Sequence, residues 1–168
     1  MAARRILRLG DPALYAVADE LRREDAGRIE GIAADLRDTL LDFRERFGRG
    51  RAIAAPQIGE RVRLVYMERP ERRVLVNPVI ADRSGETIDL WDDCMSFPDL
   101  IVKVRRNRRV RVEYRDTGWN LRVIEAGDDL SELLQHEIDH LDGVLATMRA
   151  IDERSFADAA ERERVKRR

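Results

Sequence analysis

The nine residues from Gln135 to Gly143 read QHEIDHLDG and contain the pattern H-E-x-x-H. On an α-helix of about 3.6 residues per turn, His136 and His140 lie one turn apart on the same face, so both imidazoles can reach one metal ion while Glu137 projects beside it. Two histidines at this spacing also occur on solvated helix faces, and the bare pattern recurs by chance. The chain's entire histidine content, two residues, lies in this segment. We therefore expect a metal-activated water with a carboxylate base next to it.

This segment is also expected to belong to a buried helix. Asp128 or Asp129 follows Gly127 and can act as the N-cap, and Gly143 provides a stop signal. Apolar residues at intervals of three and four form the buried side. These are Leu130, Leu133, Leu134, Ile138 and Leu141. The two histidines should therefore lie on a helix that is held in the core.

A second helix and a sheet are predicted before this one. From Asp25, a candidate N-cap, to Phe47, apolar residues advance by threes and fours, and Gly48 follows as a stop signal. From residue 61 the apolar period changes to two, which is typical of strands. The strand candidates are residues 62–66, 74–80, 101–104, 110–114 and 121–123, with a hairpin turn at 116–118. Consecutive strands joined by short turns predict an antiparallel sheet.

The composition bounds the size, compartment and partners of the protein. A length of 168 residues suits one domain (1–168), and a net charge of -1 gives no general attraction to nucleic acid or membranes. No apolar run approaches the roughly 18 residues of a membrane span, and the N-terminus lacks the apolar core of a signal peptide, so we expect a cytoplasmic protein. The single cysteine, Cys94, excludes an internal disulfide. It is either a buried small hydrophobe, the more frequent case, or a functional thiolate.

Three further segments have two interpretations each. Residues 50–59 (GRAIAAPQIG) are either a connecting loop or small residues that let a ligand approach a chain fixed by Pro56. Residues 105–111 (RRNRRVR) suggest a nucleic-acid patch, but the alternation of charged with apolar residues up to Tyr114 favours the solvated face of a strand. Residues 155–168 suggest a short capped helix whose basic end is a solvated tail, the favoured interpretation, or a contact for an acidic partner.

Three segments together indicate a family. Residues 50–57 read GRAIAAPQ, residues 92–96 read DDCMS, and residues 136–140 complete H-E-x-x-H. In this order and spacing they are similar to the motifs G-x-G-x-A-A-x-Q, E-G-C-x-S and H-E-x-x-H of the peptide deformylase family. The resemblance extends over nearly the whole chain, including Gly10-Asp11-Pro12 in a predicted N-terminal arm. Three motifs in order are far more specific than one.

The resemblance implies a catalytic metal site. It assigns Cys94, His136 and His140 as the ligands of one divalent ion. One cysteine and two histidines with water in the fourth position form a catalytic rather than a structural coordination set. The family implies Fe²⁺ as the ion in the cell, while Zn²⁺, Ni²⁺ or Co²⁺ suit the same ligands.

The resemblance also implies roles for residues around the ion. Glu137 would take a proton from water and then protonate the departing amine. Gln57 and the backbone N–H of Met95 would donate hydrogen bonds to the oxyanion, a type of contact that typically contributes about 3 kcal/mol. The residues expected to bind the substrate are Gly50, Arg51, Ala52, Ile53 and Asp93.

Three residues depart from the family pattern. Ala52 replaces the second glycine of the first motif and adds a methyl group near the substrate strand. Asp92 replaces a glutamate that pairs with an arginine in the family, and Arg106 stands at the matching position, so we expect this pair in an adjusted geometry. Asp93 replaces a glycine and adds bulk and negative charge one residue from a metal ligand. We expect the metal site to survive. The changes bear on substrate preference, because a narrower or more acidic pocket would work against formyl-methionyl peptides or favour a cationic substrate.

The sequence thus predicts an α+β fold with antiparallel sheets packed around a central helix carrying H-E-x-x-H, a long N-terminal helix and a short C-terminal helix. The predicted activity is removal of the N-formyl group from N-formylmethionyl peptides, with release of formate. One alternative is a related amidohydrolase for another N-acyl amine, motivated by Ala52 and Asp93. Another is a non-catalytic metal-binding protein that contacts the ribosome through its C-terminal end, against which the intact Glu137 argues. The expected partner is a formylated peptide or nascent chain, with no membrane and no sequence-specific nucleic acid.

Overall fold

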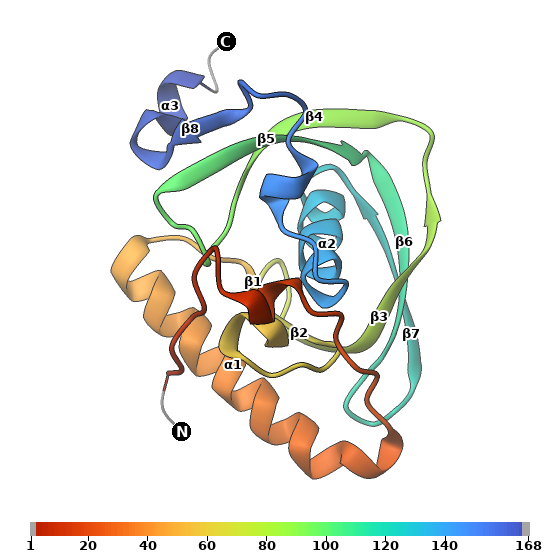
Figure 1. The fold of residues 1–168 in the computed structure, drawn as a ribbon. Helices are drawn as coiled ribbons and strands as arrows, with labels where there is room; N and C mark the ends of the chain where they lie inside the picture. The colour runs from red at the N-terminus through yellow and green to blue at the C-terminus, as the bar shows by residue number, and fades with distance from the viewer. Residues whose placement is uncertain (1–2, 166–168) are drawn as a thin grey trace.

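The computed structural model describes residues 3–165 and places one helix at the centre of two antiparallel sheets. The helices are α1 (Ala26–Phe47), α2 (Asp128–Leu141) and α3 (Arg162–Val165), with short 3-10 helices η1 (Pro12–Tyr15), η2 (Arg23–Asp25), η3 (Ala55–Ile58), η4 (Ala146–Arg149) and η5 (Ala159–Glu161). The strands are β1 (Ala52–Ala54), β2 (Leu64–Met67), β3 (Arg73–Arg83), β4 (Thr87–Asp93), β5 (Leu100–Asn107), β6 (Arg109–Arg115), β7 (Leu121–Gly127) and β8 (Phe156–Asp158). Figure 1 shows strands around α2 and the long helix α1 along one side.

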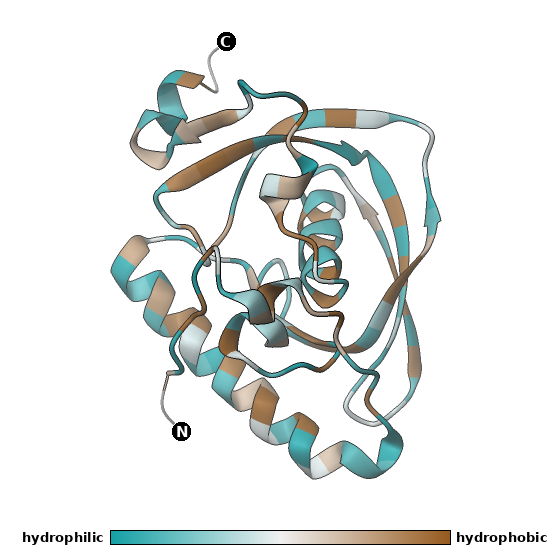
Figure 2. Ribbon diagram, viewed as in Figure 1, coloured by the Kyte–Doolittle hydropathy of each residue, from teal (hydrophilic) through white to brown (hydrophobic). Residues whose placement is uncertain are grey.

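Helix α1 forms because its apolar residues recur at helical spacing and become buried. The residues that pack in one cluster with β1, β2 and η3 include Ile29, Ile32, Leu36, Leu40 and Phe43. Figure 2 shows the resulting alternation of hydrophobic and hydrophilic residues along the helix. The helix ends where Gly48 adopts a left-handed conformation (φ 69°) and donates its N–H to Arg44 O at 2.8 Å. Asp25 precedes the helix without capping it, because its carboxylate accepts from Arg22 N instead (2.7 Å).

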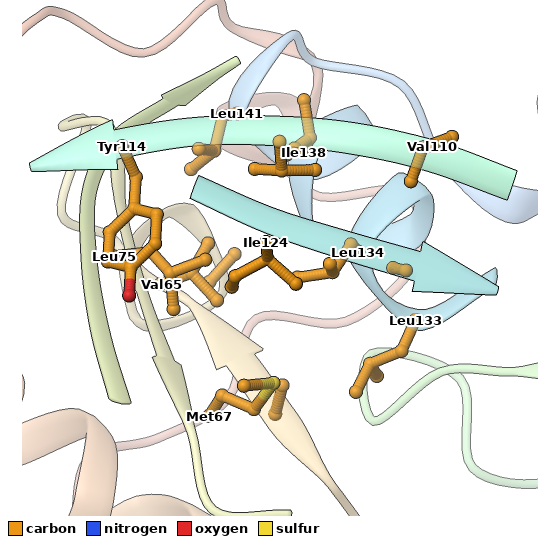
Figure 3. Close-up of a cluster of buried hydrophobic side chains, with 14 of the residues drawn as sticks. Val65, Met67, Leu75, Val110, Tyr114, Ile124, Leu133, Leu134, Ile138 and Leu141 are labelled. Atoms are coloured by element: carbon orange, nitrogen blue, oxygen red, sulfur yellow. The ribbon is translucent and has the colours of Figure 1, made fainter. Parts of the chain in front are cut away.

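The larger sheet curves around one side of α2. Its strand order is β1-β2-β3-β6-β7, and all neighbouring strands are antiparallel. The β3–β6 pairing contains two register shifts, and such irregularities bend a strand and increase its twist. The cluster between sheet and helix, shown in Figure 3, includes Val65, Met67, Leu75, Val110, Tyr114 and Ile124 from the strands and Leu133, Leu134, Ile138 and Leu141 from α2.

The smaller sheet packs near the polar side of α2. It has the order β4-β5-β8 and is also antiparallel. Its core is a small cluster that contains Cys94, Phe97, Val102, Val104 and Ala146. Helix α2 contacts β5 of this sheet as well as β3, β6 and β7 of the larger one. The helix is therefore held from both sides, as Figure 1 shows.

The N-terminal arm fixes the C-terminal end of α2. Ala18 N donates a hydrogen bond to Leu141 O (2.8 Å). Gly143, just beyond the helix, has φ 71°, and a Cβ atom there would lie 2.5 Å from Tyr15 O. Only glycine combines this backbone conformation with so close an approach of the arm.

The predicted α+β architecture is confirmed, and five of its strands correspond to β2, β3, β5, β6 and β7. The turn at 116–118 joins β6 to β7, with Asp116 N bonded to Asn120 O at 3.0 Å. The sequence patterns do not predict β1, β4 or β8. The expected cap on α2 is wrong: Gly127 occupies that position, and Asp128 (φ 47°) instead pairs with Arg108 at 2.9 Å.

Two other segments differ from expectation. Residues 155–168 do not form one helix, because Phe156–Asp158 pairs with β5 before η5 and α3 follow. Residues 166–168 of the basic end lie outside the described residues. The arginine run at 105–111 spans the end of β5 and the start of β6, and Arg106 within it is buried rather than solvated. Within residues 3–165, no helix is long and apolar enough to cross a membrane.

Candidate metal centre

Three ligand atoms converge beside α2. His136 and His140 come from this helix, and Cys94 directly follows β4. The two Nε2 atoms are 3.2 Å apart, and Cys94 Sγ lies 3.3 Å from His140 Nε2. Ligands bound at about 2.0–2.3 Å around one tetrahedral ion are separated by about 3.3–3.6 Å, so the arrangement has the size of a metal site. All three side chains are buried.

The chemistry of these donors fits a divalent ion. A thiolate and two imidazoles leave one position of a tetrahedral site open for water or substrate. Burial and the neighbouring His136 hold the pKa of His140 well below its ordinary value, which keeps this imidazole in the neutral form that binds metal. Cys94, His136 and His140 therefore form a divalent-metal site.

A chain of charged residues orients the first histidine. Asp92 Oδ2 lies 3.0 Å from His136 Nδ1 and 3.2 Å from Arg106 Nη2. Arg106 also contacts Asp139, and Arg149 Nη2 closes the chain on Asp139 Oδ1 at 2.8 Å. Burial opposes the charge on Asp92, but His136 and Arg106 outweigh it and lower the pKa of Asp92 to about 2. The aspartate thus remains ionised and directs His136 Nε2 toward the other ligands.

Glu137 lies beside the ligands and lines the same cavity as Cys94 and His136. Its side chain is buried, yet Oε2 has no hydrogen-bond partner among the described residues. Burial raises the pKa of Glu137 to about 7. A buried carboxylate oxygen without a partner is rare in folded proteins and is common where a group exchanges protons with a substrate or water.

Gln57 and Met95 border the same site. Gln57 Oε1 accepts from Ala54 N (3.0 Å), which turns Nε2 toward Cys94 Sγ (3.5 Å) and Ser96 Oγ (3.3 Å). Ser96 N also donates to the sulfur (3.4 Å). The backbone N–H of Met95 makes no hydrogen bond within the described part of the chain. Residues 50–59 are thus more than a connection, since β1 and η3 position the amide.

A cavity of about 390 Å³ opens next to these groups. Cys94, His136 and Glu137 line it, together with much of the loop before β1. Of the residues expected to bind substrate, Gly50, Arg51, Ala52 and Asp93 line the cavity. Ile53 does not, because its side chain packs in the cluster under α1. Ala52 is almost completely buried, so its added methyl group is accommodated.

Asp93 is held between two arginines. Arg49 Nε lies 3.1 Å from Asp93 Oδ2, and Arg162 Nη2 lies 2.9 Å from Asp93 Oδ1. The carboxylate charge is therefore balanced within the fold, and Asp93 does not make the cavity more acidic. Arg162 comes from α3, so this contact also ties the C-terminal segment to the site.

Several residues of the site were not predicted from the sequence. Glu132 is buried, lines the cavity, and pairs with Arg51 at 2.5 Å. Glu132 precedes His136 by about one helical turn. This spacing indicates that the two side chains lie on the same face of α2. Burial raises the pKa of Glu132 to about 7. Arg49 and Arg162 carry no local signal, because their shared partner is distant in sequence.

Comparison with known proteins identifies the relatives of this chain. The sequence model of the family described as polypeptide deformylase matches residues 3–156. A peptide deformylase from Heliobacterium modesticaldum is 39% identical over 146 residues, covering 86% of this chain and 92% of the relative. One from Dictyoglomus thermophilum is 34% identical over 151 residues, covering 89% and 94%.

Solved structures agree with these relatives. The peptide deformylase of Thermotoga maritima superposes with a TM-score of 0.83 at 28% identity, covering 90% of this chain and all of that one. A class I type b enzyme from Acinetobacter baumannii, bound to Met-Ala-Ser, gives a TM-score of 0.80 at 25% identity, covering 88% and 98%. Because the family match spans most of the sequence and the Cys-His-His triad is intact, the chain belongs to the peptide deformylase family and is a metal-dependent hydrolase that removes N-formyl groups from peptides.

Proposed function

We propose that Glu137 transfers the protons during deformylation of N-formylmethionyl peptides, while Gln57 and Met95 stabilise the oxyanion. The observation that carries this proposal is the buried Glu137 Oε2, which has no hydrogen-bond partner in residues 3–165, beside the cavity that Cys94 and His136 line. The Acinetobacter relative with bound Met-Ala-Ser supports a methionyl peptide as the ligand of such a cavity.

The residues divide the chemistry between them. A divalent ion held by Cys94, His136 and His140 supplies Lewis acidity, which lowers the pKa of water and polarises a carbonyl oxygen. Glu137 accepts one proton from the attacking water and delivers it to the amine nitrogen as the C–N bond breaks. The hydroxyl oxygen stays with the formyl carbon, and formate leaves.

Two donors face the developing negative charge. Gln57 Nε2 is aimed by the hydrogen bond between its own oxygen and Ala54 N. The Met95 N–H follows the metal ligand Cys94 directly and has no partner of its own in residues 3–165. Preorganised donors of this kind lower a barrier because they need no reorientation during the reaction.

We place the substrate along β1. This strand ends the order of the larger sheet, so an extended peptide can add to it through main-chain hydrogen bonds. The loop that leads into β1 supplies Gly50, Arg51 and Ala52 to the cavity wall, and Ile53 supports the strand from the core. Asp93 acts at the wall through the two arginines that it holds.

The ion that we propose for the cell is Fe²⁺, and Zn²⁺, Ni²⁺ and Co²⁺ suit the same ligands. A thiolate next to Fe²⁺ is prone to oxidation, so the protein has to be prepared without oxygen. Anaerobic protein loaded with Fe²⁺ is expected to release formate from formyl-Met peptides. Acetyl-Met peptides serve as the comparison, because hydrolysis of these alone would favour a different N-acyl amine as substrate. Absence of any turnover would contradict the proposal.

The substrate in the cell is proposed to be a nascent chain in the cytoplasm, with a ribosome contact through the basic C-terminal end. Truncation after Ser155 would remove β8 and Arg162, which pair with β5 and Asp93, so it would disturb the fold. Removal of residues 166–168 alone is a cleaner test. Co-sedimentation with ribosomes that is lost in this truncation supports the contact, and unchanged co-sedimentation excludes these residues from it.

A further inference from the structure

Arginines border the cavity beside the metal centre. They are Arg44 in the last turn of α1, Arg49 and Arg51 in the loop that follows, Arg69 between β2 and β3, and Arg162 in α3. The end of α1 and the β8–α3 segment lie on the same side of the molecule in Figure 1. Among residues 3–165, three carboxylates line the cavity, those of Asp93, Glu132 and Glu137. The chain as a whole has a net charge of -1, so positive charge is concentrated here.

The internal ion pairs leave part of this charge unbalanced. Asp93 pairs with Arg49 and Arg162, and Glu132 pairs with Arg51. Arg44 and Arg69 form no direct ion pair with a carboxylate in residues 3–165, although Glu68, whose pKa is lowered chiefly by Tyr66 and Arg72, also interacts with the charge of Arg44.

Even the paired arginines have spare hydrogen-bonding capacity. Arg49 Nε and Arg162 Nη2 are buried and lie close to Asp93, yet neither makes a hydrogen bond of good geometry. Each guanidinium carries five N–H donors, so one carboxylate does not satisfy two of them. Arg49 Nη2 donates to Pro98 O, so a ligand oxygen that reaches the remaining N–H groups of the two arginines would gain charge-assisted hydrogen bonds.

The position of the arginines indicates which part of a substrate they meet. The formyl group has to lie at the metal ligands, so the residues after the first one extend toward the cavity wall. A second hollow of about 470 Å³ shares Arg51, Asp93, Glu132 and Arg162 with the first. The groove continues past the Asp93–Arg162 pair, but Asp89, Asp129 and Lys103 line that part. The excess of positive charge is therefore confined to the cavity beside the metal ligands, where the first residues after formyl-methionine would lie.

We infer that this arginine rim, formed by Arg44, Arg49, Arg51, Arg69 and Arg162, selects formylated peptides with an acidic side chain shortly after formyl-methionine. The inference rests on the deformylation proposed above. Asp93 acts as a positioning residue, since it holds Arg49 and Arg162 at the rim. The preference is thus opposite to the cationic substrate that an isolated Asp93 would favour.

RNA phosphates would also bind arginines, but the rim residues line the same cavity as the metal ligands Cys94 and His136. A side chain of the reacting peptide reaches such a position more readily than a bulky polynucleotide. Competition by a single-stranded RNA oligonucleotide is therefore included in the test.

The test uses metal-loaded protein and three peptides, formyl-Met-Ala-Glu-amide and its Gln and Lys counterparts. The C-terminal amide leaves the Glu side chain as the only carboxylate. We expect kcat/KM to fall in the order Glu, Gln, Lys, with about tenfold between the first and the last at low salt and less at high salt. Equal values for all three, with normal turnover, would overturn the inference while leaving the deformylase function intact.

Helix α1 offers a matched pair of variants. Arg44→Ala removes a rim charge, whereas Arg46→Ala removes an exposed arginine of the same helix that pairs with Asp42 and does not line the cavity. We expect the Glu-to-Lys ratio to fall about threefold in the first variant and to stay unchanged in the second. Arg44→Lys should retain the preference and Arg44→Glu should reverse it. An equal response of Arg44→Ala and Arg46→Ala would contradict a local role for the rim.

Binding of the unformylated peptides, measured by calorimetry, separates this inference from the reaction itself. Tighter binding of Met-Ala-Glu-amide than of the Lys peptide supports the rim even in a preparation that does not turn over. If the RNA oligonucleotide binds and the acidic peptide shows no advantage, the rim is a nucleic-acid surface and the inference is wrong.

Discussion

Asp92 Oδ2 lies 3.0 Å from His136 Nδ1, and this contact determines which nitrogen of the histidine faces the metal centre. Because the carboxylate accepts a hydrogen bond from the Nδ1–H, Nε2 is left free as a ligand atom. Arg106 holds the same carboxylate from the other side. Asp92 has a shorter side chain than the glutamate of the family motif, but it still connects Arg106 to the metal ligand His136.

We expect Asp92→Asn to weaken metal binding by about 10- to 100-fold, because an amide orients the histidine less well than a carboxylate. Competition with a chromogenic chelator measures the change. Asp89→Asn is the matched control, since Asp89 lies on the same strand but pairs with the exposed Arg105. Equal affinities of the two variants would show that Asp92 does not support the ligand.

Asp92 should also make the metal-free protein sensitive to acid. Its pKa is about 2 in the folded protein, below the ordinary value for aspartate, so its stabilising contribution is complete above pH 4 and is lost as pH falls toward 2. The contribution corresponds to about 2 kcal/mol of unfolding free energy. Denaturant unfolding at several pH values should show this decrease, and Asp92→Asn should lack this component of it.

Glu137→Ala is expected to keep the metal and lose the reaction. The side chain is a base rather than a ligand in our proposal, so the metal content should remain near one ion per chain while kcat falls by about 10²- to 10⁴-fold. Metal analysis and a formate assay on the same sample test both statements. Activity within a few-fold of the unmodified protein would assign proton transfer to another group.

Asp93→Asn should loosen the C-terminal segment. The Arg162 pair links α3 to the cavity wall, and partly exposed ion pairs typically contribute about 0.2–1 kcal/mol each. Hydrogen exchange in residues 156–165 should accelerate up to about fivefold. Glu161→Gln, which affects an exposed pair with Arg164 in the same segment, serves as the control. If both variants exchange equally, Asp93 does not anchor the segment.

The two helices were predictable because their apolar residues follow the helical period without interruption. Strand β4 was not, although it also alternates. Ile88 and Leu90 are followed at the next inward position by Asp92, which is buried because Arg106 and His136 compensate its charge. A strand prediction that relies on alternating apolar residues fails at a position such as Asp92, where a charged residue occupies the core.

The metal ligands were predictable because the family motifs name them, and the pair on α2 has a local spacing. The arrangement around Asp93 has no such signal. Arg49 and Arg162 are brought to it by the end of α1 and by the pairing of β8 with β5. Sequence reasoning therefore recognised the added charge at Asp93 but not the charges that neutralise it.

The contact between the N-terminal arm and the end of α2 has a consequence for the order of biosynthesis. Ala18 and Tyr15 are synthesised well before their partners Leu141 and Gly143, and both histidines belong to the same later segment. Domains generally fold as units. The part of the fold that carries Gln57 and Cys94 therefore remains incomplete until α2 has been synthesised and docks against the sheets. The metal site of this deformylase is therefore completed only after α2 has been synthesised and has docked.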